Sequence, residues 1–208
     1  MIHKTFSVWL IAAVLLVVPA SARAQIQLGA KVGFAVTNFL GDSDPQFQSK
    51  ANFTGGFTFR HEMTRNHSIQ TELLYVVKGS KTQTRINDVP SDLSFTVTYL
   101  EVPALLRYSF SPRSGVSPII AAGPVVSWNI DSRVKWSAVG SDVEFSDSDD
   151  SIRGIDLGVA AEAGVDFKWD LRTISAGLRF TYGVSNIIEN PDDPKHNGAF
   201  AATVGIGL

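Results

Sequence analysis

The sequence predicts an all-β protein, an eight-stranded antiparallel up-and-down β-barrel that crosses a membrane with its strands. Three observations predict this fold: an N-terminal export signal, period-two alternation in nearly every later segment, and a less apolar face made of small or charged residues. The alternation is clearest in Leu171–Val184, where Ile174 and Leu178 share one face and Gly177 and Arg179 share the other. Successive side chains of a strand point to opposite faces. A membrane barrel turns its apolar face to lipid and its polar face inward.

Residues 1–24 are predicted to be a signal peptide. Lys4 gives a positive start, Val8–Val18 is a short apolar core, and Ala22-Arg23-Ala24 has the small-x-small form of a cleavage site. The alternative is a membrane anchor, but the apolar run is about half of the ~20 residues that a spanning helix needs. We expect the outer-membrane barrel domain to occupy residues 25–208.

Composition narrows the function classes. Without the signal, the chain has 16 basic and 20 acidic residues and no cysteine. The net charge of about −4 argues against a nucleic-acid partner. An exported chain without cysteine has no disulfides and no thiolate chemistry. Its stability is expected to come from a closed ladder of inter-strand hydrogen bonds.

The first four strands are predicted from alternating residues, and each has an apolar outer face. Pro103, in the fourth strand, lacks a backbone donor, so we expect a local bulge or a missing ladder bond there. The predicted strands are Ile26–Phe39, Asn52–His61, Ser68–Gly79 and Thr96–Tyr108. Their main outward residues are Leu28, Val32, Phe34, Phe53, Phe57, Phe59, Ile69, Leu73, Tyr75, Leu100, Val102, Leu106 and Tyr108.

The last four strands continue the same pattern to the C-terminus. In the sixth, apolar residues alternate strictly with Asp156, Gly158, Glu162 and Asp166. The predicted strands are Ile119–Ile130, Ile155–Phe167, Leu171–Val184 and Ala199–Leu208. Their main outward residues are Ile120, Val126, Trp128, Leu157, Val159, Val165, Leu178, Phe180, Phe200, Val204 and Ile206.

The predicted connections alternate in length. Three are short, at Met63–His67, Ser109–Ser117 and Lys168–Arg172. Four are longer and polar, at Asp42–Lys50, Ser80–Ser94, Asp131–Arg153 and Ser185–Asn197. Bacterial barrels have short periplasmic turns and longer extracellular loops. We therefore expect both termini in the periplasm.

Charged residues are predicted on the inner face in equal numbers. The predicted register turns ten of them inward: Lys31, Arg60, Glu72, Lys78, Glu101, Arg107, Asp156, Glu162, Asp166 and Arg179. Eight strands enclose just enough space for side chains, and unpaired buried charges are costly. We predict a plugged lumen in which Glu72, Glu101 and Arg107, with Arg60 or Arg179, form one ion network. Glycines on the inner faces would make room for the arginines.

Aromatic residues near strand ends are predicted to form girdles at the two membrane–water boundaries. The girdle candidates are Tyr99, Tyr108, Phe110, Trp128, Trp136, Trp169 and Tyr182. The alternative is ordinary packing of exposed loops.

Three further groups of residues are weak candidates for a metal site, a catalytic site and a calcium-binding loop. His61 and His67 flank a turn, but no carboxylate pattern completes a metal site. His196 lies near Ser185 and two aspartates, yet no motif fixes a catalytic arrangement. The acidic loop Asp131–Arg153 lacks the glycine and distal glutamate of a calcium loop, so a solvated loop is preferred to calcium binding. We predict no cofactor, no metal and no catalytic residues.

Four segments carry a family resemblance. They are residues 28–33 (LGAKVG), 70–75 (QTELLY) with Lys78-Gly79, 99–108 (YLEVPALLRY) and 122–124 (AGP). The chain resembles the outer-membrane β-barrel family that includes PorT-like proteins of Bacteroidetes-type bacteria. The resemblance covers essentially residues 25–208 and implies an eight-stranded outer-membrane barrel without one defined activity. One departure is the final Leu208, where such barrels usually end in an aromatic residue.

The favoured function is a non-enzymatic structural or surface-interaction barrel in the bacterial outer membrane. Its partners would be outer-membrane lipid and a protein at the cell surface or in the periplasm. The alternatives are a small-solute porin, an accessory barrel of a protein secretion system, which only the resemblance implies, and a lipid-modifying enzyme. A soluble lipocalin-like barrel is the alternative fold, with the apolar face inside.

Overall fold

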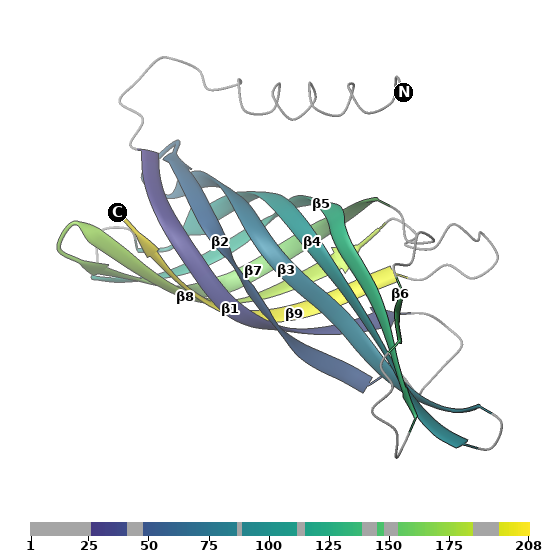
Figure 1. Cartoon of the computed structure of the whole chain (residues 1–208). Coiled ribbons are helices and arrows are strands. Elements are labelled where there is room, and N and C mark those ends of the chain that lie inside the picture. Colours follow the sequence, from purple (N-terminus) through teal and green to yellow (C-terminus); the bar gives the residue numbers. More distant parts are fainter. Residues whose placement is uncertain are drawn as a thin grey trace, which may run out of the picture.

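Eight long strands pair side by side around a common axis in the computed structural model of the chain (Figure 1). The structure describes residues 26–40, 48–86, 89–111, 115–138, 145–147, 154–184 and 196–208. The strands are β1 (Ile26–Leu40), β2 (Gln48–Glu62), β3 (His67–Ile86), β4 (Val89–Ser109), β5 (Val116–Ala138), β6 (Phe145–Asp147), β7 (Ile155–Trp169), β8 (Arg172–Gly183) and β9 (His196–Gly207). Within the described ranges, no helix has the length and apolar character of a membrane span.

The ring is closed, because the two ends of the strand series pair with each other. The sheet order is β4-β3-β2-β1-β9-β8-β7-β5-β6, and an additional pairing joins β4 to β5. Every pairing is antiparallel. The short β6 pairs with β5 beyond the ring, from Val134 opposite Asp147 to Trp136 opposite Phe145. The predicted eight-stranded barrel is thus confirmed, with one short strand added.

The outer surface of the barrel is apolar, as the alternation predicted. Phe34 is 69 % exposed, Phe57 63 % and Leu178 52 %, and no predicted outward residue named above has moved to the lumen. Such exposure would be a severe aggregation hazard in water, whereas hydrocarbon solvates it. The lipocalin-like alternative is wrong, since the residues that it would expose, Glu72 and Arg179, are buried.

The inner face carries polar and also apolar side chains, among them Leu105 and Ala160, whose strand positions predict an inward orientation. Polar and charged side chains share it with an apolar cluster of Leu105, Ala121, Val125 and Ala160, contributed by β4, β5 and β7. This apolar patch lies directly beside charged groups, because Ala121 pairs with Arg107 on β4 and with Glu162 on β7.

Two predicted loops are wrong, because strands continue through them. In the predicted loop Ser80–Ser94, β3 runs on to Ile86, which pairs with Val89 at the start of β4. In the predicted loop Asp131–Arg153, β5 continues to Ala138, opposite Ser91. Residues 81–85 are all polar and carry no apolar alternation, so backbone pairing alone defines this part of β3.

Pro103 does not produce a bulge. The register of β3 and β4 is the same on both sides of it, with Thr71 opposite Ala104 and Leu74 opposite Glu101. The proline falls between these pairs, in an interruption of the ladder. The register shift of β4 lies instead at Thr98, in its pairing with β5.

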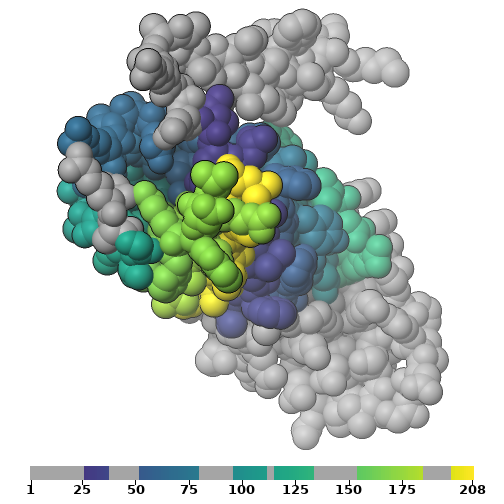
Figure 2. Space-filling view, turned by 90° about the vertical axis from the view of Figure 1, so that its left-hand side faces the viewer, coloured from purple at the N-terminus to yellow at the C-terminus, as the bar shows by residue number. Residues whose placement is uncertain are grey.

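The two ends of the barrel differ. The three short turns, the start of β1 and the end of β9 lie at one end, which we call the short-turn end (Figure 1). Figure 2 looks onto this end, where the first strand, the β2–β3 and β7–β8 turns and the C-terminus gather. The extended β3–β4 hairpin projects from the opposite end (Figure 1).

Candidate functional site

The candidate site is the group of charged side chains in the lumen. Nine of the ten predicted inward charges are buried, and Arg60 is partly buried at the short-turn end. They form three groups along the barrel, which we call the central cluster, the mouth cluster and the Lys78–Glu101 pair. Asp156 lies on the inner face opposite Ser127 of β5.

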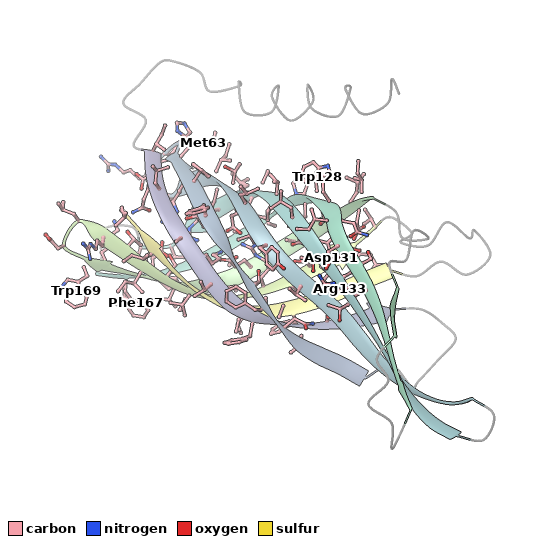
Figure 3. The ribbon with its side chains drawn as sticks, viewed as in Figure 1. Met63, Trp128, Asp131, Arg133, Phe167 and Trp169 are labelled. Carbon is pink, nitrogen blue, oxygen red and sulfur yellow. The ribbon has the colours of Figure 1, made fainter. Side chains whose placement is uncertain are left out.

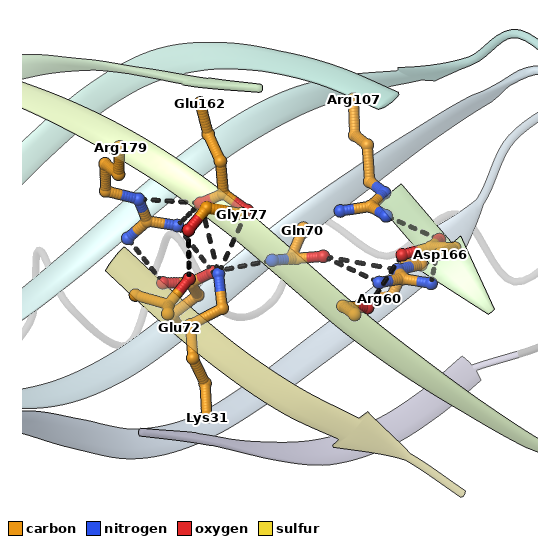
Figure 4. Close-up of polar contacts among 11 residues, drawn as sticks. Lys31, Arg60, Gln70, Glu72, Arg107, Glu162, Asp166, Gly177 and Arg179 are labelled. Atoms are coloured by element: carbon orange, nitrogen blue, oxygen red, sulfur yellow. Dashed lines mark hydrogen bonds and ion pairs between the residues drawn. The ribbon is translucent and has the colours of Figure 1, made fainter. Parts of the chain in front are cut away.

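The central cluster consists of two cations and two carboxylates from four strands: Lys31, Glu72, Glu162 and Arg179 (Figure 4). Arg179 donates from Nη1 to Glu72 Oε2 over 2.7 Å and from Nε to Glu162 Oε2 over 2.8 Å. Lys31 Nζ lies 2.9 Å from Glu72 Oε1 and 3.1 Å from Glu162 Oε2. Each carboxylate therefore meets both cations, and the cluster is formally neutral. Charge-assisted hydrogen bonds of this kind are short and strong.

Small residues surround the central cluster. Lys31 pairs across the sheet with Gly56 on β2 and with Gly205 on β9. Arg179 lies opposite Glu162 on β7 and Ala201 on β9. The prediction that glycines make room for the arginines is therefore wrong for these direct pairs, because the glycines flank the lysine. Gly177 does lie close by, where an added Cβ would be 3.3 Å from Glu162 Oε1.

The mouth cluster lies nearer the short-turn end and has two guanidinium groups for one carboxylate. Arg107 Nη2 is 2.5 Å and Arg60 Nη1 is 3.4 Å from the same oxygen, Asp166 Oδ2. The other oxygen, Oδ1, accepts a hydrogen bond from Ser175 over 2.7 Å. Gln70 links the two clusters, because its Oε1 accepts from Arg60 and its Nε2 donates to Glu72 over 2.6 Å (Figure 4).

The third group lies toward the end of the barrel opposite the short turns, which we call the long-loop end. Lys78 Nζ is 2.7 Å from Glu101 Oε1, and Ser127 donates to the same oxygen over 3.2 Å. Lys78 also lies 4.8 Å from the centre of the Tyr99 ring, a cation–π contact. Consequently Glu101 lies apart from Glu72, which differs from the single network that the sequence predicted. Arg107 reaches Glu72 only indirectly, through Asp166, Arg60 and Gln70. Nine of the ten charges divide into these three groups at different heights along the barrel, and the tenth, Asp156, lies opposite Ser127 of β5.

The girdle prediction is wrong for Tyr99, which is 1 % exposed and faces the lumen. Its position follows from the alternation of the strand, in which residues two positions apart share a face; we call this parity. The residues of β4 with the same parity as Tyr99 also face inward: Glu101, Pro103, Leu105 and Arg107. The other described candidates, Tyr108, Phe110, Trp128, Trp169 and Tyr182, lie on or near the outer surface. Figure 3 shows Trp169 at the short-turn end and Trp128 nearer the other end. Tyr108 packs edge-to-face against His67 and Phe110. The side chain of Trp136 lies outside the described residues.

Two cavities adjoin the mouth cluster. A polar hollow of about 280 Å³ opens at the short-turn end, and Arg60, Asp166 and Gln27 form part of its wall. A smaller cavity of about 20 Å³ lies deeper and shares Gln27 and Arg60 with the hollow. Sequence reasoning did not predict either cavity.

The weaker candidate sites gain no support. Within the described ranges, no group of three or more His, Asp or Glu side chains is placed to hold a metal ion. Asp131, at the start of the acidic segment, pairs with Arg133 over 2.9 Å. His196 begins β9 opposite Leu40, while Ser185 and both nearby aspartates lie outside the described residues, as does most of residues 139–153.

The fold is shared with known outer-membrane proteins. Neisserial surface protein A superposes with a TM-score of 0.50 at 16 % identity, covering 89 % of this chain and 99 % of that one. The attachment invasion locus protein Ail of Yersinia pestis, in complex with sucrose octasulfate, gives 0.47 at 14 % identity, covering 88 % and 99 %. The outer membrane enzyme PagL gives 0.46 at 14 % identity, covering 84 % and 97 %. At these identities the likeness concerns the fold alone.

No protein with curated annotation matches the chain by sequence. The family comparison does give a match, over residues 20–189. This range includes β1 to β8, with both charged clusters. The closed barrel, its apolar outer face and this match agree that the chain belongs to the family of outer membrane protein beta-barrel domains, proteins of the bacterial outer membrane.

Proposed function

We propose that the chain is a non-enzymatic surface-interaction barrel, which binds a protein partner through the sheet that projects from its long-loop end. The observation that carries the proposal is the length of three neighbouring strands. β3, β4 and β5 have 20, 21 and 23 residues. A strand needs only ~9–11 residues to cross the hydrocarbon layer. About half of each strand is therefore available outside it.

The projecting sheet is suited to a partner in water. Its sequence is polar in residues 81–85 and 91–94, apart from Leu93. The last pair between β2 and β3 is Gln48–Lys81, and β3 continues to Ile86 in pairing with β4. Among the described residues, none pairs with this edge of β3 over Thr82–Ile86. Such an edge accepts an extended segment of another protein by strand addition.

The occupied lumen favours this function over a small-solute porin. Side chains from four strands meet in the central cluster, and the mouth cluster continues this obstruction toward the short-turn end. We expect the refolded protein to give no channel openings in a planar bilayer, once a heat-modifiable band has shown that it is folded. Steady, ion-selective openings would contradict the proposal and favour the porin.

A photo-crosslinking amino acid at Thr84 tests the partner directly. In intact cells, we expect a covalent product with a second protein, identified by mass spectrometry. The matched control joins Ser80 to Phe95 through an Asn-Gly turn. These residues are already paired, so the shortened hairpin keeps the barrel register.

The crosslinking result also separates the alternatives. The shortened variant lacks Thr84, so its binding is measured by co-purification of the partner. Loss of the partner, while the heat-modifiable band shows a folded barrel, supports the proposed site. Products formed only from a probe at Arg172, at the short-turn end, would contradict it and favour a periplasmic partner. That outcome would favour the accessory role in protein secretion that the PorT-like resemblance implies.

A further inference from the structure

The mouth cluster carries one more positive charge than its carboxylate can neutralise. The central cluster pairs two cations with two carboxylates, whereas Arg60 and Arg107 share one oxygen of Asp166. Arg107 is 1 % exposed and Arg60 is only partly exposed, so bulk water solvates little of this excess charge. A buried, uncompensated cation is costly. The site therefore favours an additional negative charge nearby.

Arg107 also has an unused hydrogen-bond donor. Its Nη2 pairs with Asp166, but its Nε has no acceptor among the described residues. Arg60, by contrast, donates to Gln70 and Gln27. Buried donors without a protein acceptor are rare in folded proteins, and a bound ion or water is a usual reason for them.

The small cavity of about 20 Å³ lies against these groups. Three cationic side chains line it, Lys31, Arg60 and Arg107. The rest of its described lining consists of amides, hydroxyls, glycine and apolar atoms: Gln27, Ala30, Thr58, Gln70, Ser175, Gly205, Ile206 and Gly207. No carboxylate of the described residues lines it. A cavity of ~10–15 Å³ already holds one water-sized particle, so this one has room for a single small ion.

We propose that this cavity binds a single halide ion, chloride under ordinary conditions, between Lys31, Arg60 and Arg107. The ion accepts a hydrogen bond from the unused Nε–H group of Arg107 and neutralises the mouth cluster. It enters from the short-turn end, because Arg60 and Gln27 line both the outer hollow and the cavity. The other occupant of suitable size is a neutral water molecule, which would leave the excess charge in place.

Bromide locates the site directly. In crystals of the wild-type protein grown with sodium bromide, we expect an anomalous scattering peak in the cavity, within hydrogen-bond distance of Arg107. A well-ordered water there, with no anomalous signal at molar bromide, would overturn the proposal.

Thermal unfolding in detergent gives a second readout. At constant ionic strength, we expect the melting temperature to rise as sodium chloride replaces sodium gluconate, since a ligand that binds only the folded state stabilises it. Arg107→Met leaves Arg60 and Asp166 as a neutral pair, so this rise should disappear. Arg133→Gln, which alters an exposed ion pair, is the matched control and should keep it. An equal chloride response in all three proteins would refute the halide site.

Discussion

Replacing Arg179 with methionine is expected to lower the free energy of unfolding by about 3–5 kcal/mol, the usual loss when one partner of a buried ion pair is removed. Arg179 lies between Glu72 and Glu162, and its side chain is 6 % exposed. Without it, two buried carboxylates share only Lys31. Urea unfolding of the barrel in lipid vesicles, followed by the heat-modifiable band, measures the change.

A second substitution separates charge from packing. Arg179→Met with Glu162→Gln leaves Lys31 and Glu72 as a neutral pair, 2.9 Å apart. We expect the double variant to be more stable than the single one, because no unpaired charge remains. Arg179→Lys, which keeps the charge but not the forked donors, should fall between the wild type and Arg179→Met. A loss below about 0.5 kcal/mol in Arg179→Met would show that the central cluster does not stabilise the barrel.

The sequence predicted which side of the sheet each charged residue occupies, but not which charges meet. Parity along a strand fixes the face, and it placed Glu72 and Arg179 in the lumen. Their meeting depends on relative height along the barrel axis, which is set by the stagger of strands far apart in sequence. Glu72 and Arg179 are 107 positions apart, joined through no shared motif. The division into two clusters and a separate ion pair was therefore not predictable from spacing.

Tyr99 shows two sequence rules in conflict. Its position near a predicted strand end favoured the girdle, whereas its parity with Glu101 favoured the lumen. Parity prevailed because β4 does not end there but continues back to Val89. The misplaced tyrosine thus follows from the missed extension of β4. The extension of β3 was missed because residues 81–85 are all polar, so the apolar alternation that predicts strands is absent there.

Adding one methyl group at Gly56 is expected to destabilise the barrel about as strongly as losing a buried charge partner. Gly56 lies on β2 between Lys31 on β1 and Leu74 on β3. A Cβ built there would be 1.9 Å from the backbone oxygen of Leu73. A side chain could rotate away from such a contact, but a ladder carbonyl cannot move without weakening the hydrogen bonds that close the ring. We therefore expect Gly56→Ala to cost about 3 kcal/mol or more, at the upper end for overpacking.

Gly115 provides the matched control, since a Cβ built on this turn glycine meets nothing within 4 Å. Gly115→Ala should refold with the wild-type yield and urea midpoint, whereas Gly56→Ala should show a smaller heat-modifiable fraction and a lower midpoint. Equal behaviour of the two variants would mean that β2 and β3 can separate locally without loss of closure. The Gly56 substitution therefore tests closure of the ring. A membrane barrel with an open seam leaves backbone donors and acceptors unpaired in hydrocarbon. A single glycine between β1 and β3 therefore supports both the ring of hydrogen bonds and the space in which Lys31 reaches Glu72.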